Sequence, residues 1–458
     1  MDSYLSAIAF PLTTSTLICA PLAYLLVPEF SSQQIKWQIS GVSTYLVRSI
    51  TPYLCLISIL GFFFQNGIVG FSLNRYLITS AMAWIMLPIN IAILIFTSGV
   101  QVKGGFYYIG VATVFPSLTS FLFCLLAVSK TGIEWVLVGQ LLGAALVLTH
   151  LLNSQATHPI IAKDIRVQIL ANLPKGLLAT LIFSVYPISD AYWGKVVGVS
   201  TTSHLAYAQK IIVGLSGVIV AAANMIAYQQ IADLASEGKE NEIRKYLIKK
   251  IMTVVDFVLP MSIIVGATAK TLGLTAIQKF NTGRFNAQDV IAIAEMLRPM
   301  LVGMVFMSTM GFVFKCMVAE KKNSQAAVIS VAGSVLYFLI SGFFQRFGGA
   351  TGIGYAYMVT WVVVFIVSVI YLFTGKFIQS IIRDVSSELT KSLIRNILAA
   401  LVSCGLIIWF TILSEKTGMS WVVVVASKTA SVALVFLLIR MVSFSNAISF
   451  IRLGFKKS

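Results

Sequence analysis

Apolar residues occur along the chain in long uninterrupted runs that are separated by short polar segments. A helix needs roughly 20 apolar residues to cross a hydrocarbon core about 30 Å thick. The runs are too long for barrel strands and do not alternate with a period of two, so each predicts a membrane-spanning α-helix. We count thirteen such runs, at 4–27, 45–70, 77–98, 106–128, 133–152, 172–192, 205–228, 250–276, 294–318, 325–343, 351–373, 392–413 and 420–442.

Composition agrees with an all-α polytopic membrane protein. Of the 458 residues, 58% are hydrophobic and only 11% are charged, whereas soluble domains carry about 25% charge. Too few polar residues are present to cover a globular surface, which excludes a soluble enzyme, a disordered chain and a secreted disulfide scaffold. The five cysteines lie singly in separate runs and the three histidines are scattered, so we expect no disulfide framework, no metal site and no cofactor.

The soluble segments are too short for a catalytic domain. The two largest, 153–171 and 229–249, have about 20 residues each, and no nucleotide-binding or hydrolase motif stands out in the chain. We therefore expect no enzymatic activity and no nucleotide. The working part must be the helical bundle, and moving a solute across the membrane is its natural task.

The basic residues predict an orientation. Sixteen Lys and Arg residues fall in one set of alternating loops and seven in the other, and the richer set belongs in the cytoplasm. This places the C-terminus in the cytoplasm. Anionic lipid at the cytoplasmic face is then a sufficient partner for most of the +17 net charge, and nucleic acid is not needed.

Two short repeats suggest an internal duplication. The segment 45–50, Tyr-Leu-Val-Arg-Ser-Ile, resembles 246–251, Tyr-Leu-Ile-Lys-Lys-Ile, and Thr-Gly-Ile occurs at both 131–133 and 351–353. Each pair opens runs that lie six spans apart, an even number, so the paired helices run in the same direction. This predicts two pseudo-symmetric lobes related by an axis along the membrane normal, a common transporter plan.

The duplication sets the expected domains. The N-terminal lobe is expected at 1–160, the C-terminal lobe at 161–375, and two additional helices with a basic cytoplasmic tail at 376–458. The sixth span has no counterpart, because its partner would precede Met1. We therefore expect the first helix of the N-terminal lobe to be missing, and an in-frame coding stretch for one helix upstream of Met1.

Charged side chains within the runs are candidate functional residues, because they are costly in a membrane. Lys210 lies about five residues into its run, roughly 8 Å deep at 1.5 Å per residue. It either lines a cavity or extends to the outer interface. Asp190 and Asp256 also lie within runs; each is a candidate for the cavity, with an interfacial or helix-end carboxylate as the alternative.

Several segments carry a family resemblance. The sequence Gly283-Arg284-Phe285, followed by Asp289, looks like a Gly-(Lys/Arg)-Phe-Thr-x-x-Asp loop, and Tyr207 to Lys210 is similar to Tyr-Ala-Asp-Arg at the start of a cavity-lining helix. Asp2 opens a first run that looks like a second helix beginning Asp-Ala-Phe. Together they resemble the MviN/MurJ branch of the multidrug/oligosaccharidyl-lipid/polysaccharide exporter superfamily.

The resemblance implies a flippase for undecaprenyl-pyrophosphate-linked saccharides in the bacterial inner membrane, working by alternating access. In this branch the substrate is lipid II, the peptidoglycan precursor. It also implies one helix more than the chain contains, in agreement with the unmatched span. Lys210 matches the cavity arginine of the family by position, and a lysine can contact pyrophosphate as a point charge.

Departures from the family pattern keep other functions open. The family's second helix carries an arginine after its proline, where this chain reads Leu12 to Thr16 without a cation. A thinner cationic cavity favours a sister role, flipping an O-antigen or exopolysaccharide repeat unit. A drug/cation antiporter and a non-transporting truncated relic are further alternatives. The glycan, the energy coupling and the oligomeric state are not fixed by the sequence.

Overall fold

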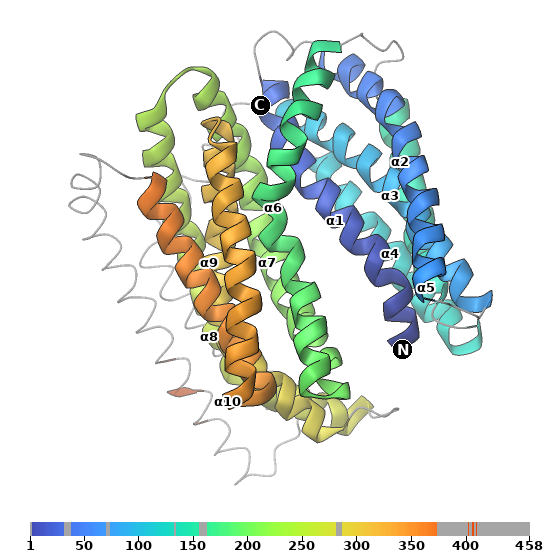
Figure 1. The fold of residues 1–458 in the computed structure, drawn as a ribbon, viewed down its shortest axis with the longest axis vertical. Helices are drawn as coiled ribbons and strands as arrows, with labels where there is room; N and C mark the ends of the chain where they lie inside the picture. Colours follow the sequence, from blue (N-terminus) through green and yellow to red (C-terminus); the bar gives the residue numbers. More distant parts are fainter. Residues whose placement is uncertain are drawn as a thin grey trace. The chain divides into compact units, whose positions relative to one another are not determined.

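The computed structural model describes residues 2–31, 38–69, 74–131, 134–154, 163–280 and 286–372, and a few positions between 402 and 409. Within these ranges every regular element is an α-helix and there is no strand (Figure 1). The helices are α1 (Asp2–Ser31), α2 (Ile39–Val69), α3 (Asn74–Val102), α4 (Phe106–Thr131), α5 (Glu134–Ser154), α6 (Lys163–Val197), α7 (Val199–Ser236), α8 (Glu240–Phe280), α9 (Ala287–Ala319) and α10 (Asn323–Leu372).

The helices confirm an all-α polytopic membrane fold. Each of the first eleven predicted runs lies in a helix, and among the described residues six helices are long and apolar enough to cross a membrane. Most helices are longer than their apolar runs, because backbone hydrogen bonding continues into polar flanking residues. The two predicted C-terminal runs, and most of 376–458, lie outside the described residues.

The loop expected between the tenth and eleventh runs is instead a sharp bend within α10. Gly349 has φ 55° and ψ −131°, and helical residues continue on both sides. A positive φ is cheap only for glycine, because it lacks Cβ. Gly352 allows the two halves to approach, since a Cβ there would lie 2.2 Å from the carbonyl oxygen of Phe344. Two spans therefore meet in a glycine-dependent hairpin rather than in a polar loop.

Contacts along the chain define two compact units. Unit 1 comprises Met1–Ser184, Tyr228–Glu240 and Lys315–Ser330, and unit 2 comprises Val185–Ala227, Asn241–Phe314 and Val331–Ser458. The division passes through α6, α7, α9 and α10 instead of falling at a loop. The lobe boundaries expected from the repeat remain a prediction.

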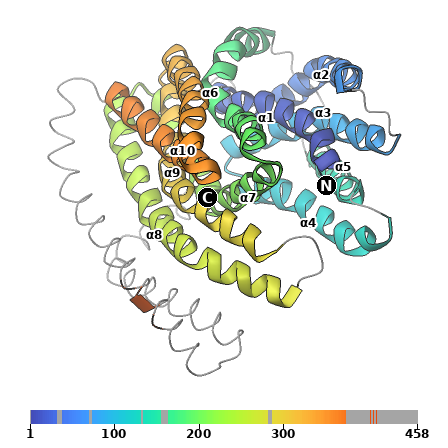
Figure 2. The same ribbon diagram turned by 60° about the horizontal axis from the view of Figure 1, so that its bottom comes forward.

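Unit 1 is organised around α3, which packs against α1, α2, α4 and α5 (Figures 1 and 2). Its core contains large side chains with almost no exposed surface, including Phe30 of α1, Leu46 of α2 and Ile91 of α3. The last turns of α7 belong to the same core through Tyr228 and Ala232.

Two hydrogen bonds connect further helices within unit 1. The amide of Gln229 in α7 donates to the carbonyl oxygen of Val102 at 3.1 Å. The backbone N–H of Ile182 in α6 donates to the hydroxyl of Ser330 in α10 at 2.9 Å. Residues distant in sequence are thus held together within unit 1.

Helices α4 and α5 touch through two glycines spaced four residues apart. A Cβ on Gly139 would lie 2.7 Å from the carbonyl oxygen of Thr119, and one on Gly143 would lie 2.7 Å from Cα of Pro116. Small residues at this spacing let membrane helices approach backbone to backbone, where dispersion contacts hold them.

This contact predicts opposite effects for two glycine-to-alanine substitutions. Gly139→Ala should lower the thermal unfolding midpoint in detergent, because overpacking typically costs about 1–3 kcal/mol. Gly110→Ala on α4 is the matched control, since a Cβ there meets nothing within 4 Å, and alanine is favoured over glycine in helices by roughly 1 kcal/mol. Equal midpoints for the two variants would contradict the close α4–α5 contact.

Candidate functional site

Asp190 is a buried carboxylate that joins three helices of unit 2. Its side chain lies on α6 and is 3% exposed. The hydroxyl of Tyr337 in α10 donates to Oδ1, and the side-chain amide of Gln209 in α7 donates to Oδ2. Asp190 is thus enclosed by helices and does not extend to solvent, and whether it lies at the depth of a cavity or of the interface remains a prediction. Both oxygens are used within the bundle, and no described Lys, Arg or His pairs with them.

Aromatic side chains surround this carboxylate. Tyr186 lies one turn before Asp190 on α6, and its ring centroid is 5.8 Å from that of Tyr357 in α10, edge to face. Tyr357 also meets Tyr337 at 6.3 Å and Trp361 at 6.2 Å. Such edge-to-face pairs add stability beyond apolar burial. The hydrogen bonds to Asp190 are therefore made next to a cluster of packed aromatic rings.

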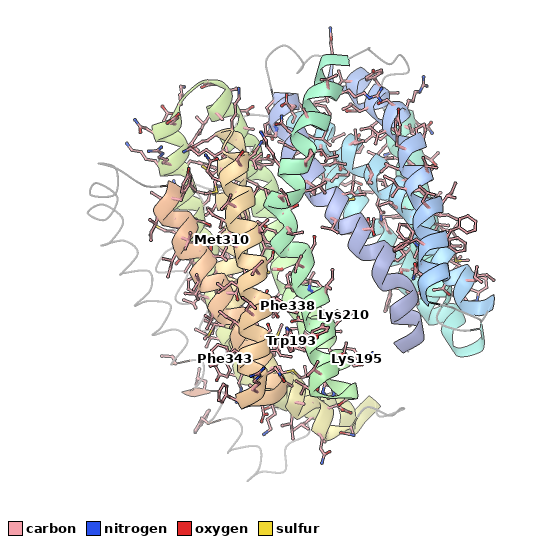
Figure 3. All side chains as sticks on the ribbon, in the orientation of Figure 1. Trp193, Lys195, Lys210, Met310, Phe338 and Phe343 are labelled. Atoms are coloured by element: carbon pink, nitrogen blue, oxygen red, sulfur yellow. The ribbon has the colours of Figure 1, made fainter. Side chains whose placement is uncertain are left out.

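A second α6–α10 contact lies close in sequence to Asp190. The indole N–H of Trp193 donates to the carbonyl oxygen of Phe338 at 3.0 Å, and the two rings are 5.3 Å apart (Figure 3). Gly342 makes room for the indole, because a Cβ there would lie 2.5 Å from Trp193 Cζ2. The Trp193–Phe338 and Asp190–Tyr337 hydrogen bonds therefore both hold α6 in the same register against α10.

Lys210 follows Gln209 on α7 but is exposed (Figure 3). Successive residues of a helix point about 100° apart, so the amide can turn into unit 2 while the ammonium turns away from it. The Nζ atom lies 5.8 Å from the ring centroid of Tyr207, and no described carboxylate pairs with it. Gly214, one turn further on, has no atom within 4 Å of a built Cβ. Lys210 thus stands on an open face of α7.

Asp289, from the family-like loop motif, caps α9. The Asn286 side chain accepts the N–H groups of Gln288 at 2.8 Å and Asp289 at 3.1 Å, and Asp289 Oδ2 accepts the N–H of Asn286 at 2.8 Å. This reciprocal arrangement satisfies backbone donors at a helix N-terminus. The remaining oxygen of Asp289 meets Nε2 of His204 in α7 at 2.8 Å. Both oxygens are occupied within the protein.

The other predicted site residues are not brought into one cluster. Asp256 lies half-buried in α8, where neighbouring groups interact with it. Asp2 begins α1, but its side chain lies outside what the structure describes, as do Gly283, Arg284 and Phe285. Their roles in substrate binding remain predictions.

Sequence reasoning missed two cations inside apolar helices. Lys250, which is 5% exposed, lies with Nζ 5.0 Å from the ring of Tyr246, one turn earlier on α8. Lys315 in α9 lies with Nζ 5.1 Å from the ring of Tyr228 in α7. Hydropathy could have located both lysines, whereas only folding reveals that α7 supplies the ring for Lys315. Both contacts are cation–π interactions, which gain strength when desolvated.

These features define a polytopic membrane protein with a bundle like that of MurJ and MATE transporters. The chain is similar to a lipid II flippase MurJ in an inward closed conformation, with a TM-score of 0.67 and 14% identity over 98% of this chain and 93% of that chain. It is also similar to a variant of the Vibrio cholerae MATE transporter VcmN, with a TM-score of 0.64 and 11% identity over 84% of this chain and 87% of that chain. A third similar structure is an outward-facing multidrug resistance MATE transporter of the MOP superfamily, with a TM-score of 0.63 and 12% identity over 81% of this chain and 88% of that chain.

The family follows from the sequence itself. Residues 1–429 match the family described as lipid II flippase MurJ, so the chain belongs to this family, and the resemblance noted from its motifs is confirmed. No curated protein sequence matches the chain.

The buried carboxylate predicts a stability difference between two tyrosine variants. Tyr337→Phe removes one donor to Asp190 and should lower the free energy of unfolding by about 1–3 kcal/mol, the cost of an unsatisfied buried polar group. Tyr192→Phe on α6 is the control, because Tyr192 is 54% exposed and its ring contacts survive the change. The measurement is the thermal midpoint of purified protein in detergent. Equal midpoints would show that Tyr337 does not support Asp190.

Proposed function

We propose that the protein is a flippase that moves a polyprenyl-pyrophosphate-linked saccharide, lipid II in the first instance, across the bacterial inner membrane by alternating access. Membership of the MurJ family over residues 1–429 is the observation that carries this proposal. The coarser statement, a multi-pass membrane protein of a family that flips lipid-linked precursors, does not depend on any single side chain.

Lys210 supports the assignment physically. A pyrophosphate–saccharide head cannot enter hydrocarbon without polar partners, and an exposed ammonium on an open face of a membrane helix offers one. The adjacent Gln209 anchors α7 to Asp190, so the backbone that carries Lys210 is held in place. We propose Lys210 as a pyrophosphate-binding residue, with Asp2, Asp190, Asp256 and the 283–289 loop as weaker candidates for the substrate path.

The orientation is part of the same proposal. The Lys/Arg bias places the C-terminus and the last turns of α7 toward the cytoplasm. At that end Tyr228 and Ala232 are packed into the core of unit 1.

A drug/cation antiporter is the second candidate, and one observation favours it. Asp190 is a buried carboxylate with only neutral hydrogen-bond partners described, the kind of group that can exchange a cation or a proton. An antiporter needs a carboxylate buried within a lobe, for which Asp256 is the candidate from sequence; because Asp256 is only half-buried and Asp190 is buried, we propose Asp190 for that role. Loss of resistance to cationic drugs in an Asp190→Asn strain, with normal cell-wall precursors, would favour the antiporter over the flippase.

Substitutions at Lys210 test the flippase. If its ammonium neutralises pyrophosphate, Lys210→Ala should abolish flipping, Lys210→Glu should be at least as severe, and Lys210→Arg should retain much of it. An anionic head without a counter-cation faces a cost of several kcal/mol in a low-dielectric site. The measurement is lipid-linked precursor accumulating in the inner leaflet at normal protein levels.

The identity of the accumulated precursor separates the two branches of the proposal. Lipid II accumulation with lysis on depletion identifies peptidoglycan flipping. Accumulation of a glycan repeat unit in viable cells with a surface-polysaccharide defect identifies the sister role. Wild-type transport by Lys210→Glu would remove Lys210 from the site and indicate a lysine that is solvated at the interface.

A further inference from the structure

Helix α2 presents an exposed apolar face that extends over eleven residues, from Tyr53 to Phe63. Tyr53 is 59% exposed, Leu56 53%, Leu60 59% and Phe63 67%. These positions are spaced three and four residues apart, so they lie on one side of the helix. The stretch is about 15 Å long at 1.5 Å per residue, which is half of the roughly 30 Å hydrocarbon core, the depth of one lipid leaflet.

A cation from another helix sits at the end of this face. The Arg166 guanidinium, in the first turn of α6, lies with Nη2 3.5 Å from the hydroxyl of Tyr53 and with Cζ 5.8 Å from its ring centroid. A hydrogen bond to Tyr45 and a second one to Tyr53 raise the pKa of Arg166. The guanidinium is therefore held against Tyr53, with Tyr45 two turns earlier on α2 as a second phenol beside it, and it is half-buried.

The same end of α2 carries a second cation. Arg48 is exposed and lies between the two tyrosines in sequence. No described carboxylate pairs with Arg48 or Arg166. Lysines that precede two other helices with exposed apolar residues already have partners within the protein. Lys103, before α4, donates to the Ser40 hydroxyl at 2.6 Å, and Lys322, before α10, forms an ion pair with Glu320 at 2.5 Å.

We propose that Arg166, Tyr45 and Tyr53 form a binding site for the phosphate of an anionic phospholipid whose acyl chains lie along the exposed face of α2, with Arg48 as an additional cation at the same end of the helix. The guanidinium offers planar paired donors that match phosphate oxygens. Each phenol oxygen accepts from Arg166, which leaves its own O–H free to donate to the same phosphate. The apolar residues that follow, Leu56, Leu60 and Phe63, supply the surface for one leaflet's chains.

The site is separate from Lys210, the residue proposed to bind pyrophosphate. All of its residues belong to unit 1, whereas Lys210 belongs to unit 2. The occupant is a bilayer phospholipid rather than the flipped substrate, because the site combines a phosphate-sized cationic end with an apolar face as deep as a single leaflet. A phospholipid held there would bridge α2 and α6, the two helices that supply its ligands.

The test is lipid binding to the purified full chain by native mass spectrometry, with phosphatidylglycerol and phosphatidylcholine of identical acyl chains as probes. The wild type should retain phosphatidylglycerol in preference. Arg166→Gln should weaken phosphatidylglycerol binding about fivefold, and adding Arg48→Gln should weaken it about 25-fold, as expected for about 1 kcal/mol per charge. Phosphatidylcholine binding should change little.

Two further variants separate a built site from diffuse surface charge. Lys239→Gln is the matched control, because it removes a half-exposed cation of the same unit that is paired with Glu237. It should leave the lipid preference unchanged. The double variant Tyr45→Phe/Tyr53→Phe keeps every charge and should still reduce the preference, because the guanidinium loses both phenol oxygens. Should Arg166→Gln fail to fold, Arg48→Gln and the tyrosine double variant carry the test.

Three results would overturn the proposal. The first is equal wild-type retention of the two phospholipids, which would mean that the face is ordinary annular surface. The second is an equal loss in Lys239→Gln, which would indicate diffuse charge. The third is displacement of phosphatidylglycerol by a polyprenyl diphosphate at equal concentration, which would assign the site to the transported substrate.

Discussion

The bilayer interior offers no hydrogen bonds, so a polar group carried into it must find its partner within the protein or line a path for water. Asp190 takes the first course. Its oxygens accept from Tyr337 and Gln209, and these two bonds tie α6 to α10 and α7 inside unit 2. The cluster of aromatic rings and the Trp193–Phe338 contact hold α6 in register against α10.

Lys210, which is exposed on α7, is the residue that we propose lines such a path. Because Gln209 is held by Asp190, the next side chain along α7 must point away from that buried bond, and the ammonium stands exposed beside Tyr207. The proposed function would give this exposed cation a role, because a lipid-linked pyrophosphate needs a counter-charge on its way across the membrane. The buried Gln209–Asp190 hydrogen bond thus positions Lys210, the residue proposed to bind pyrophosphate.

The helices could be predicted from the sequence, and the buried contacts could not. A run of about 20 apolar residues has few alternatives to a spanning helix, and so the first eleven runs were found. Hydropathy gives the depth of a residue along a helix but not its direction, so it left open what Asp190 faces and could not identify Tyr337, 147 positions away, as its partner. Asp289 was found by motif, but its partner His204 was not. The bend at Gly349 depends on a backbone angle, which apolar patterning does not encode.

The most direct measurement is transport by the purified chain in sealed vesicles. A fluorescent polyprenyl-pyrophosphate saccharide would be placed in both leaflets, and the fraction accessible to a membrane-impermeant quencher would be followed with time. The proposed function predicts that the protein makes the inner-leaflet pool accessible, while a labelled phosphatidylcholine of the same vesicles stays protected. An unchanged inner-leaflet pool for lipid II and for glycan repeat-unit lipids alike would contradict the flippase assignment for this chain.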